Sequence, residues 1–148
     1  MRVVLQRVTR ADVKIEGQAV ATIGGGLLLF VGIGKGDREQ DADRMAAKIT
    51  KLRIFGDENG KMNRSVLDVA GQVLVVSQFT LHADCSRGNR PGFEGAEQPA
   101  RARLLVDRLV EALASCGLVV RTGVFGADMS VSLTNDGPVT ILLDTDTM

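Results

Sequence analysis

Ser77, Gln78, Phe79 and Thr80 form the first segment whose residue types could do chemistry. They follow an apolar run at residues 73–76, so the sequence changes from a buried strand to polar residues at a single position. Polar groups at a strand end can hold a ligand, and backbone N–H groups there can face a developing oxyanion. Alternatively, Ser77 and Thr80 only satisfy backbone groups where the strand leaves the sheet. The residue types alone leave both interpretations open.

The second candidate is Asn135-Asp136-Gly137-Pro138, which lies between two predicted strands. This combination is a strong turn signal and is typical of a hairpin turn. A more specific possibility is a cis peptide bond before Pro138. Only about 5–6% of X–Pro bonds in folded proteins are cis, so the sequence alone gives this possibility little weight.

Arg7 is the third candidate, because a strand over residues 3–8 places it on the same face as Val3 and Leu5. An arginine on an apolar face usually extends its charged end to solvent. Less often it binds carbonyl oxygens through its rigid guanidinium group.

Signatures of other chemistries are missing. There is no Walker loop, and the glycines at 24–26 are better explained by a hairpin than by a dinucleotide fingerprint. The only histidine, His82, is two residues from Thr80 on what is expected to be the same strand, so no Ser-His-Asp arrangement is indicated. Cys85 and Cys116 form no CxxC pair, so no metal site is expected. Cys116 falls on an apolar helical position and is predicted to be a small core residue.

The elements that must position these residues follow from periodicity and turn signals. We expect strands at 13–16, 18–23 and 27–33, the last buried on both faces. A helix follows, with Asp37 and Gln40 at capping-box spacing. Asn59-Gly60 marks a tight turn. A strand over 73–76 runs on to 81, and a long polar loop covers 82–98. A second helix begins near Pro99 and ends at Gly117, and strands at 119–125, 129–134 and 139–144 finish the chain.

This order predicts an α+β fold: about eight strands in antiparallel or mixed, barrel-like sheets with two helices, as a single domain over residues 1–148. A repeated parallel crossover unit is not expected. Eighteen basic residues balance eighteen acidic ones, which argues against strong non-specific binding to nucleic acid. Eight basic residues in or just past the middle third leave a local basic patch open, against ordinary solvated surface: Lys51, Arg53, Lys61, Arg64, Arg87, Arg90, Arg101 and Arg103. Two cysteines, no signal peptide and no membrane-length apolar run predict a cytoplasmic protein with no membrane association.

The two candidate segments together resemble the signature motifs of D-aminoacyl-tRNA deacylases, and the resemblance covers essentially the whole chain. Its motifs are Ser77-Gln78-Phe79-Thr80-Leu81 and Asn135-Asp136-Gly137-Pro138-Val139-Thr140. Five further blocks follow in the family's order: residues 6–8, 52–55 with 57–62, 88–91, and 125–129. Several blocks in the right order are far more specific than either motif alone.

The resemblance implies a homodimer that acts on an amino acid esterified to the terminal adenosine of tRNA, at the acceptor end. Gly137 and Pro138 would be a Gly-cisPro motif that enters the partner's site, where its carbonyl oxygens reject an L side chain. Arg7 would hold that motif through its carbonyls. D-aminoacyl-tRNA, and mischarged glycyl-tRNA, would be hydrolysed.

For the chemistry, the resemblance assigns little to side chains. Backbone N–H groups around Phe79 and Thr80 would stabilise the oxyanion, and the ribose 2′-hydroxyl would help to activate water. Gln78, Phe125 and Met129 would seat the adenosine. No metal or organic cofactor is implied. Two alternatives stay open: a general esterase with Thr80 as a covalent nucleophile, and a non-catalytic tRNA- or nucleotide-binding module.

Overall fold

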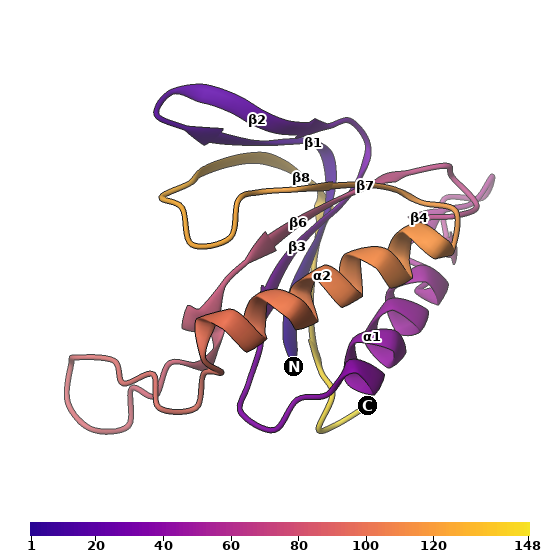
Figure 1. The fold of residues 1–148 in the computed structure, drawn as a ribbon. Helices are drawn as coiled ribbons and strands as arrows, with labels where there is room; N and C mark the ends of the chain where they lie inside the picture. The colour runs from indigo at the N-terminus through magenta and orange to yellow at the C-terminus, as the bar shows by residue number, and fades with distance from the viewer.

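A long N-terminal strand organises the fold in the computed structural model, which describes residues 1–148. This strand, β1 (Arg2–Ile15), pairs antiparallel with β8 (Ser130–Asp144) along most of its length (Figure 1). On its other edge it pairs with β3 (Gly26–Gly32) and then with β2 (Gln18–Ile23), both antiparallel. One strand therefore belongs to two halves of a six-stranded sheet, which curls into the barrel-like form predicted from the sequence.

The rest of the sheet is parallel. β3 pairs with β6 (Gln72–Ser77), and β6 pairs with β7 (Val119–Thr122). The chain crosses between them through α1 (Glu39–Lys51) and α2 (Pro99–Ser115). The mixed pairing is confirmed, but the expectation of no repeated parallel crossover is wrong. The hydrophobic pattern of a strand does not distinguish parallel from antiparallel pairing, because a strand buried on both faces can pair in either direction.

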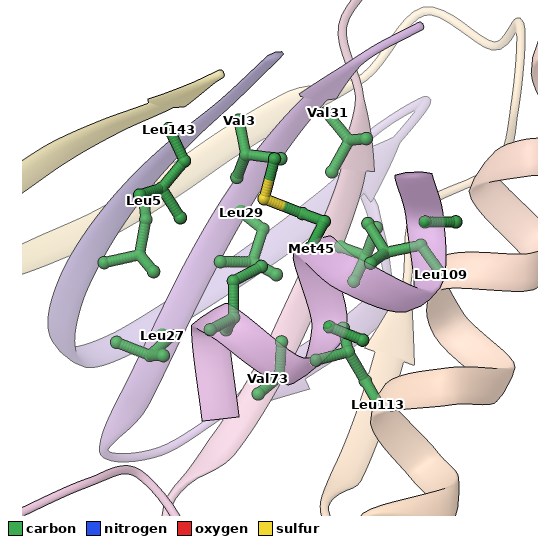
Figure 2. Packing of buried hydrophobic residues seen from close by; sticks show 14 of the residues in the cluster. Val3, Leu5, Leu27, Leu29, Val31, Met45, Val73, Leu109, Leu113 and Leu143 are labelled. Carbon is green, nitrogen blue, oxygen red and sulfur yellow. The ribbon is translucent and has the colours of Figure 1, made fainter. Parts of the chain in front are cut away.

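Two helices cover one face of the sheet and leave the other face to a second core. Leu27, Leu29 and Val31 of β3 point toward the helices and pack with Met45 of α1 and with residues of α2 (Figure 2). The residue between them, Leu28, is also fully buried but packs into the second cluster, inside the curled half of the sheet. The predicted burial of this strand on both faces is thus confirmed.

The remaining elements are short. β4 (Phe55–Gly56) and β5 (Met62–Arg64) form a separate two-stranded sheet around the predicted turn at Gly60. β6 does not run on to residue 81 as expected: it ends at Ser77, and a 3-10 helix, η1 (Phe79–His82), follows. Neither α1 nor α2 has the length and apolar character that a membrane-spanning helix needs.

The predicted cap of the first helix is displaced by one residue. The cap is Arg38, whose N–H donates to Asp41 Oδ2 at 2.9 Å. Asp37 instead accepts from the N-terminal ammonium of Met1 at 2.6 Å and from the Gly34 N–H at 2.7 Å. Its carboxylate is therefore occupied by groups that a local pattern cannot show.

Cys116 is exposed, which contradicts its predicted place in the core. The apolar stripe of α2 is buried only as far as Leu113. Cys116 is the residue at which the helix ends, before Gly117 at φ +93°. A periodic pattern extended past the last full turn therefore assigns one residue too many.

The two strands predicted at 129–134 and 139–144 are one strand, β8, and no hairpin turn separates them. Both halves pair with β1, but two steps along β1, from Gln6 to Val8, correspond to five along β8, from Thr140 to Asn135. The extra residues include Gly137 and Pro138, and the peptide bond between them is cis. The candidate segment is thus a bulge in a continuous strand.

Candidate active site

The main cavity of the molecule, about 590 Å³, lies where β3 and β6 end. Its walls come from β6, η1, the start of α2 and the β7–β8 connection. Five of the nine predicted site residues line it: Ser77, Gln78, Phe79, Phe125 and Met129. The other four do not. Thr80 lies next along η1, and Arg7, Gly137 and Pro138 form a separate cluster at the bulge.

The end of β6 and the start of η1 place two adjacent backbone donors beside the cavity. The Gln78 N–H still donates to the Val31 carbonyl at 2.7 Å, as the last bond to β3. η1 then begins, and the Leu81 N–H donates to the Gln78 carbonyl at 3.2 Å. Phe79 and Thr80 are the first two residues of η1, so their N–H groups have no acceptor within that helix. Two adjacent donors can bind an oxygen that gains negative charge.

Glycines at the end of β3 allow η1 to approach this closely. A Cβ atom on Gly32 would lie 2.9 Å from the Gln78 carbonyl oxygen, and one on Gly34 would lie 2.8 Å from Cε1 of His82. The His82 ring therefore packs directly against the strand end, and its Nε2 is buried without a hydrogen-bond partner. In the sequence analysis, His82 was considered only as a possible member of a Ser-His-Asp triad, and no packing role was predicted for it. The two glycines near it in the fold were the available signal for close packing.

The side chains of the segment do not activate Thr80. Its hydroxyl is hydrogen-bonded to the side-chain amide of Gln78, which is not a base. A threonine nucleophile requires a nearby base, so this arrangement offers it no activation. Phe79 is 57% exposed and meets Phe93 edge-on, with ring centroids 5.0 Å apart. The two rings form an apolar rim at the cavity.

The opposite wall is also apolar. Phe125 and Met129 lie in the segment between β7 and β8, and Gly123 ties that segment to β6 through a 3.0 Å bond to the Val75 carbonyl. A Cβ on Gly123 would lie 2.6 Å from the Met129 sulfur, so the glycine makes room for that side chain. Apolar walls with a few polar groups suit a flat aromatic ligand.

The charged residues that line the cavity are acidic. They are Glu97, which pairs with Arg101 at 3.3 Å, and Asp128. No lysine, arginine or histidine lines it. No group of three or more His, Cys, Asp or Glu side chains is arranged to hold a metal ion.

Arg7 takes the less common of its two predicted conformations. Its side chain is only 13% exposed, and its Nε lies 3.2 Å from the Asp136 carbonyl oxygen and 3.1 Å from the Asp136 carboxylate. The guanidinium group also donates to the Ile54 carbonyl and lies 5.9 Å from the Phe55 ring centroid. It thus binds carbonyls, but those of Asp136 and Ile54 rather than those of Gly137 and Pro138.

Asn135 completes the support of the bulge. Its side-chain amide donates to the Arg7 carbonyl at 2.9 Å and to the Val139 carbonyl at 3.0 Å, so it joins the two sides of the bulge. Gly137 has φ +117°, and a Cβ there would lie 2.5 Å from Arg7 Nη2. Gly137 and Pro138 are both exposed and lie outside the cavity of their own chain.

Comparison with known proteins identifies the family of this chain. Residues 4–144 match the family model described as D-Tyr-tRNA(Tyr) deacylase. The chain belongs to the D-aminoacyl-tRNA deacylase family. A relative named D-aminoacyl-tRNA deacylase from Paracoccus denitrificans is 58% identical, over 97% of each chain. One of the same name from Thermotoga petrophila is 56% identical, over 97% of each.

A solved structure shows the same fold in a similar chain. A protein described as c-Myc DNA Unwinding Element Binding Protein is 40% identical, with a TM-score of 0.91 over 97% of this chain and 98% of that one. The resemblance inferred from the two motifs is therefore confirmed at the level of the family. Of the two motifs behind that resemblance, the first contributes residues 77–79 to the cavity and the second, at 135–140, spans the bulge.

Proposed function

We propose that the chain hydrolyses the ester bond of D-aminoacyl-tRNA, in the cytoplasm and without a cofactor. The observation that carries this proposal is the start of η1, which places the N–H groups of Phe79 and Thr80 beside an apolar cavity in a chain of this family. Acyl transfer needs such donors where negative charge develops.

In the proposed reaction, water attacks the ester carbonyl carbon and the carbonyl oxygen becomes an oxyanion. The two N–H groups donate to that oxygen. The ribose 2′-hydroxyl takes part in removing the proton from water, since the segment has no basic side chain placed to do so. The tetrahedral intermediate then breaks the bond to the ribose 3′-oxygen, which leaves with a proton, and the free amino acid is released.

The terminal adenosine occupies the cavity in this proposal. Phe125 and Met129 give its base an apolar wall, and Gln78 supplies polar groups near the ribose. Ser77, the last residue of β6, closes the polar end. A volume of about 590 Å³ is sufficient for a nucleoside and lies in the usual range of small-molecule sites.

In this proposal the chain forms a homodimer, and selection for D-amino acids takes place where the two chains meet. Gly137 and Pro138 of one chain enter the partner's cavity, where their carbonyl oxygens face the α-carbon and collide with an L side chain. Three facts support this: the pair is exposed, it lies outside its own cavity, and Arg7 and Asn135 hold the bulge that carries it. Glycyl-tRNA, which has no side chain to reject, is hydrolysed too. Each tenfold of discrimination needs about 1.4 kcal/mol, which a steric clash can supply.

Replacing Phe79 tests the role of the N–H groups. Phe79→Pro removes one donor at the first position of η1, where proline is tolerated, and Phe79→Ala removes the ring but keeps the donor. We expect the proline variant to lose about 100- to 1,000-fold in the rate of D-Tyr release from D-tyrosyl-tRNA relative to the alanine variant. Equal rates in the two variants would refute the proposed oxyanion site.

The same assay separates the alternatives. Cleavage of simple esters without tRNA, abolished by Thr80→Ala, would favour the general esterase. Binding of tRNA without release of amino acid would favour the non-catalytic module.

Mixing inactive variants tests the shared site. A dimer of one Phe79→Pro chain and one Gly137→Ala chain contains one intact site if the bulge acts in the partner's cavity. Random mixing then restores about a quarter of the wild-type activity. No recovery after verified subunit exchange would place the bulge and the cavity in separate sites.

A further inference from the structure

The long loop between η1 and α2 carries a distinct outer part. The Asp84 N–H donates to the Gly92 carbonyl at 2.8 Å and the Gly92 N–H to the Asp84 carbonyl at 2.9 Å. These two bonds close residues 85–91, here called the tip. In Figure 1 the loop extends from the body of the molecule at the lower left, beyond the start of α2. The tip is thus a closed, projecting turn.

The tip has two charged side chains, and both are cationic. Arg87 and Arg90 are exposed, and neither takes part in an ion pair or a side-chain hydrogen bond. The nearest acids in sequence lie at the base of the tip or below it. Of these, the Asp84 carboxylate accepts a hydrogen bond from the Ser86 N–H at 2.9 Å. Hydrogen bonds from Ser86 lower the pKa of the Asp84 carboxyl below its ordinary value.

Both ends of this loop are walls of the cavity. The loop starts directly after η1, whose Phe79 lines the cavity, and it returns through Phe93 and residues 96–98, which also line it. The tip therefore projects from the rim of the site. The cavity contains Glu97 and Asp128 and no cationic side chain, so it is unsuited to a phosphate.

We propose that Arg87 and Arg90 bind the phosphodiester backbone of the tRNA strand that leads into the cavity. This inference rests on the proposed function, because it takes the terminal adenosine as the occupant of the cavity. The strand leaves past the rim, where its phosphates need cationic partners that the cavity lacks. Guanidinium groups are suited to phosphate because their donors match its oxygens in pairs.

Two other arginines lie close to the cavity. Arg101 pairs with Glu97 at 3.3 Å and donates to the Asp37 carbonyl at 2.9 Å, so its guanidinium group already has partners. Arg103 of α2 lines a smaller cavity of about 270 Å³ that shares Ser77 and Phe125 with the main one. Asp107, one turn further along α2, lines the same small cavity. A carboxylate in that confined space opposes phosphate binding, so the tip is the better candidate.

Salt dependence of binding gives a direct test with uncharged tRNA as the probe. Each phosphate neutralised on a single strand contributes about −0.7 to the slope of log K against log salt. Two lost contacts predict that wild type loses roughly sevenfold more affinity between 50 and 200 mM salt than the double variant R87Q/R90Q. The variant R87K/R90K keeps both charges and should keep most of the slope.

Two matched variants complete the experiment. K48Q/K51Q removes the same charge from α1, where both lysines are exposed and unpaired, and should keep the wild-type slope. R103Q tests whether Arg103 binds the phosphates instead. The proposal is overturned if R87Q/R90Q keeps the wild-type slope, if K48Q/K51Q changes it equally, or if R103Q alone accounts for the change.

Hydrolysis supplies a second readout. R87Q/R90Q should lower kcat/KM for D-tyrosyl-tRNA more than for D-tyrosyl-adenosine, which has no phosphate. Equal losses on both substrates would show that the tip acts on the cavity and not on phosphate. Wild-type protein that cleaves neither substrate would overturn the proposed function, while the binding slopes would still decide the role of the tip.

Discussion

Replacing Gly137 with alanine places a methyl group against the guanidinium of Arg7. The added Cβ would lie 2.5 Å from Arg7 Nη2 and 3.1 Å from Val139 Cγ2, at φ +117°, which L side chains rarely adopt. Backbone strain of this kind costs about 1–3 kcal/mol, or roughly 3–12 °C in Tm for a chain of this size. Arg7 must also move, which disturbs its bond to the Asp136 carbonyl.

The expected loss of activity exceeds the loss of stability. If the bulge positions the substrate, a displacement near 1 Å costs on the order of a hundredfold in rate. We therefore expect Gly137→Ala to lower kcat/KM for D-tyrosyl-tRNA by about that factor at a temperature where the variant is folded. The assays are thermal unfolding and single-turnover release of D-Tyr.

Gly17→Ala is the matched control. Gly17 has φ +79°, but a Cβ there meets no atom within 4 Å, so it adds backbone strain without a steric contact. The control should lose some stability and keep full deacylase activity. If Gly137→Ala matches Gly17→Ala in both Tm and kcat/KM, the contact with Arg7 has no role and the reasoning is refuted.

Three further results are expected. Arg7→Lys should unfold at a lower temperature, since one ammonium cannot replace a planar group bound to two carbonyls, and should lose about 1–3 kcal/mol in urea titrations; an unchanged midpoint would contradict this. Thr80→Ala should keep most of its rate of D-Tyr release, because the proposed donor is its N–H, and a complete loss would favour the nucleophile. Burial raises the pKa of Asp144, but hydrogen bonds from the Asp146 N–H and Arg2 outweigh it and hold that pKa below its ordinary value. The folded state therefore gains stability above the ordinary pKa and loses it as the pH falls through the lowered one. Asp144→Asn should show a smaller fall in urea midpoint between pH 6 and pH 3 than wild type, and an equal fall would refute that assignment.

Local patterns predicted the elements that are long and periodic. The strand that includes Leu27 and the helix that ends before Gly117 are both confirmed, because their burial repeats over several residues. Asp37 shows the limit of such patterns. It has the type and spacing of a cap, yet its carboxylate binds the N-terminus of Met1, which is 36 positions away.

The bulge could not be predicted from local sequence either, because it depends on contacts between residues far apart in the chain. Asn135 to Pro138 favours a turn in any context, and a hairpin and a bulge have the same local signal. Only the pairing of both halves of β8 with β1 distinguishes them. Arg7 was recognised as a candidate because it breaks an apolar face, but its partner Ile54 lies 47 positions away.

The residues that line the cavity were predicted through resemblance more than through pattern. Ser77 to Phe79 drew attention as a polar strand end, whereas Phe125 and Met129 were assigned only because the family motifs included them. The proposed N–H donors depend on β6 ending and η1 beginning at this place. The sequence predicted a continuing strand there, in which the donors would have been paired.

Hydrolysis of D-tyrosyl-tRNA and L-tyrosyl-tRNA by the same wild-type preparation tests the central claim most directly. The two substrates differ only in configuration at the α-carbon, so tRNA binding and the adenosine site contribute equally to both. The account predicts rapid release of D-Tyr and no release of L-Tyr above the uncatalysed rate. Equal release from both substrates, or release from neither, would contradict it.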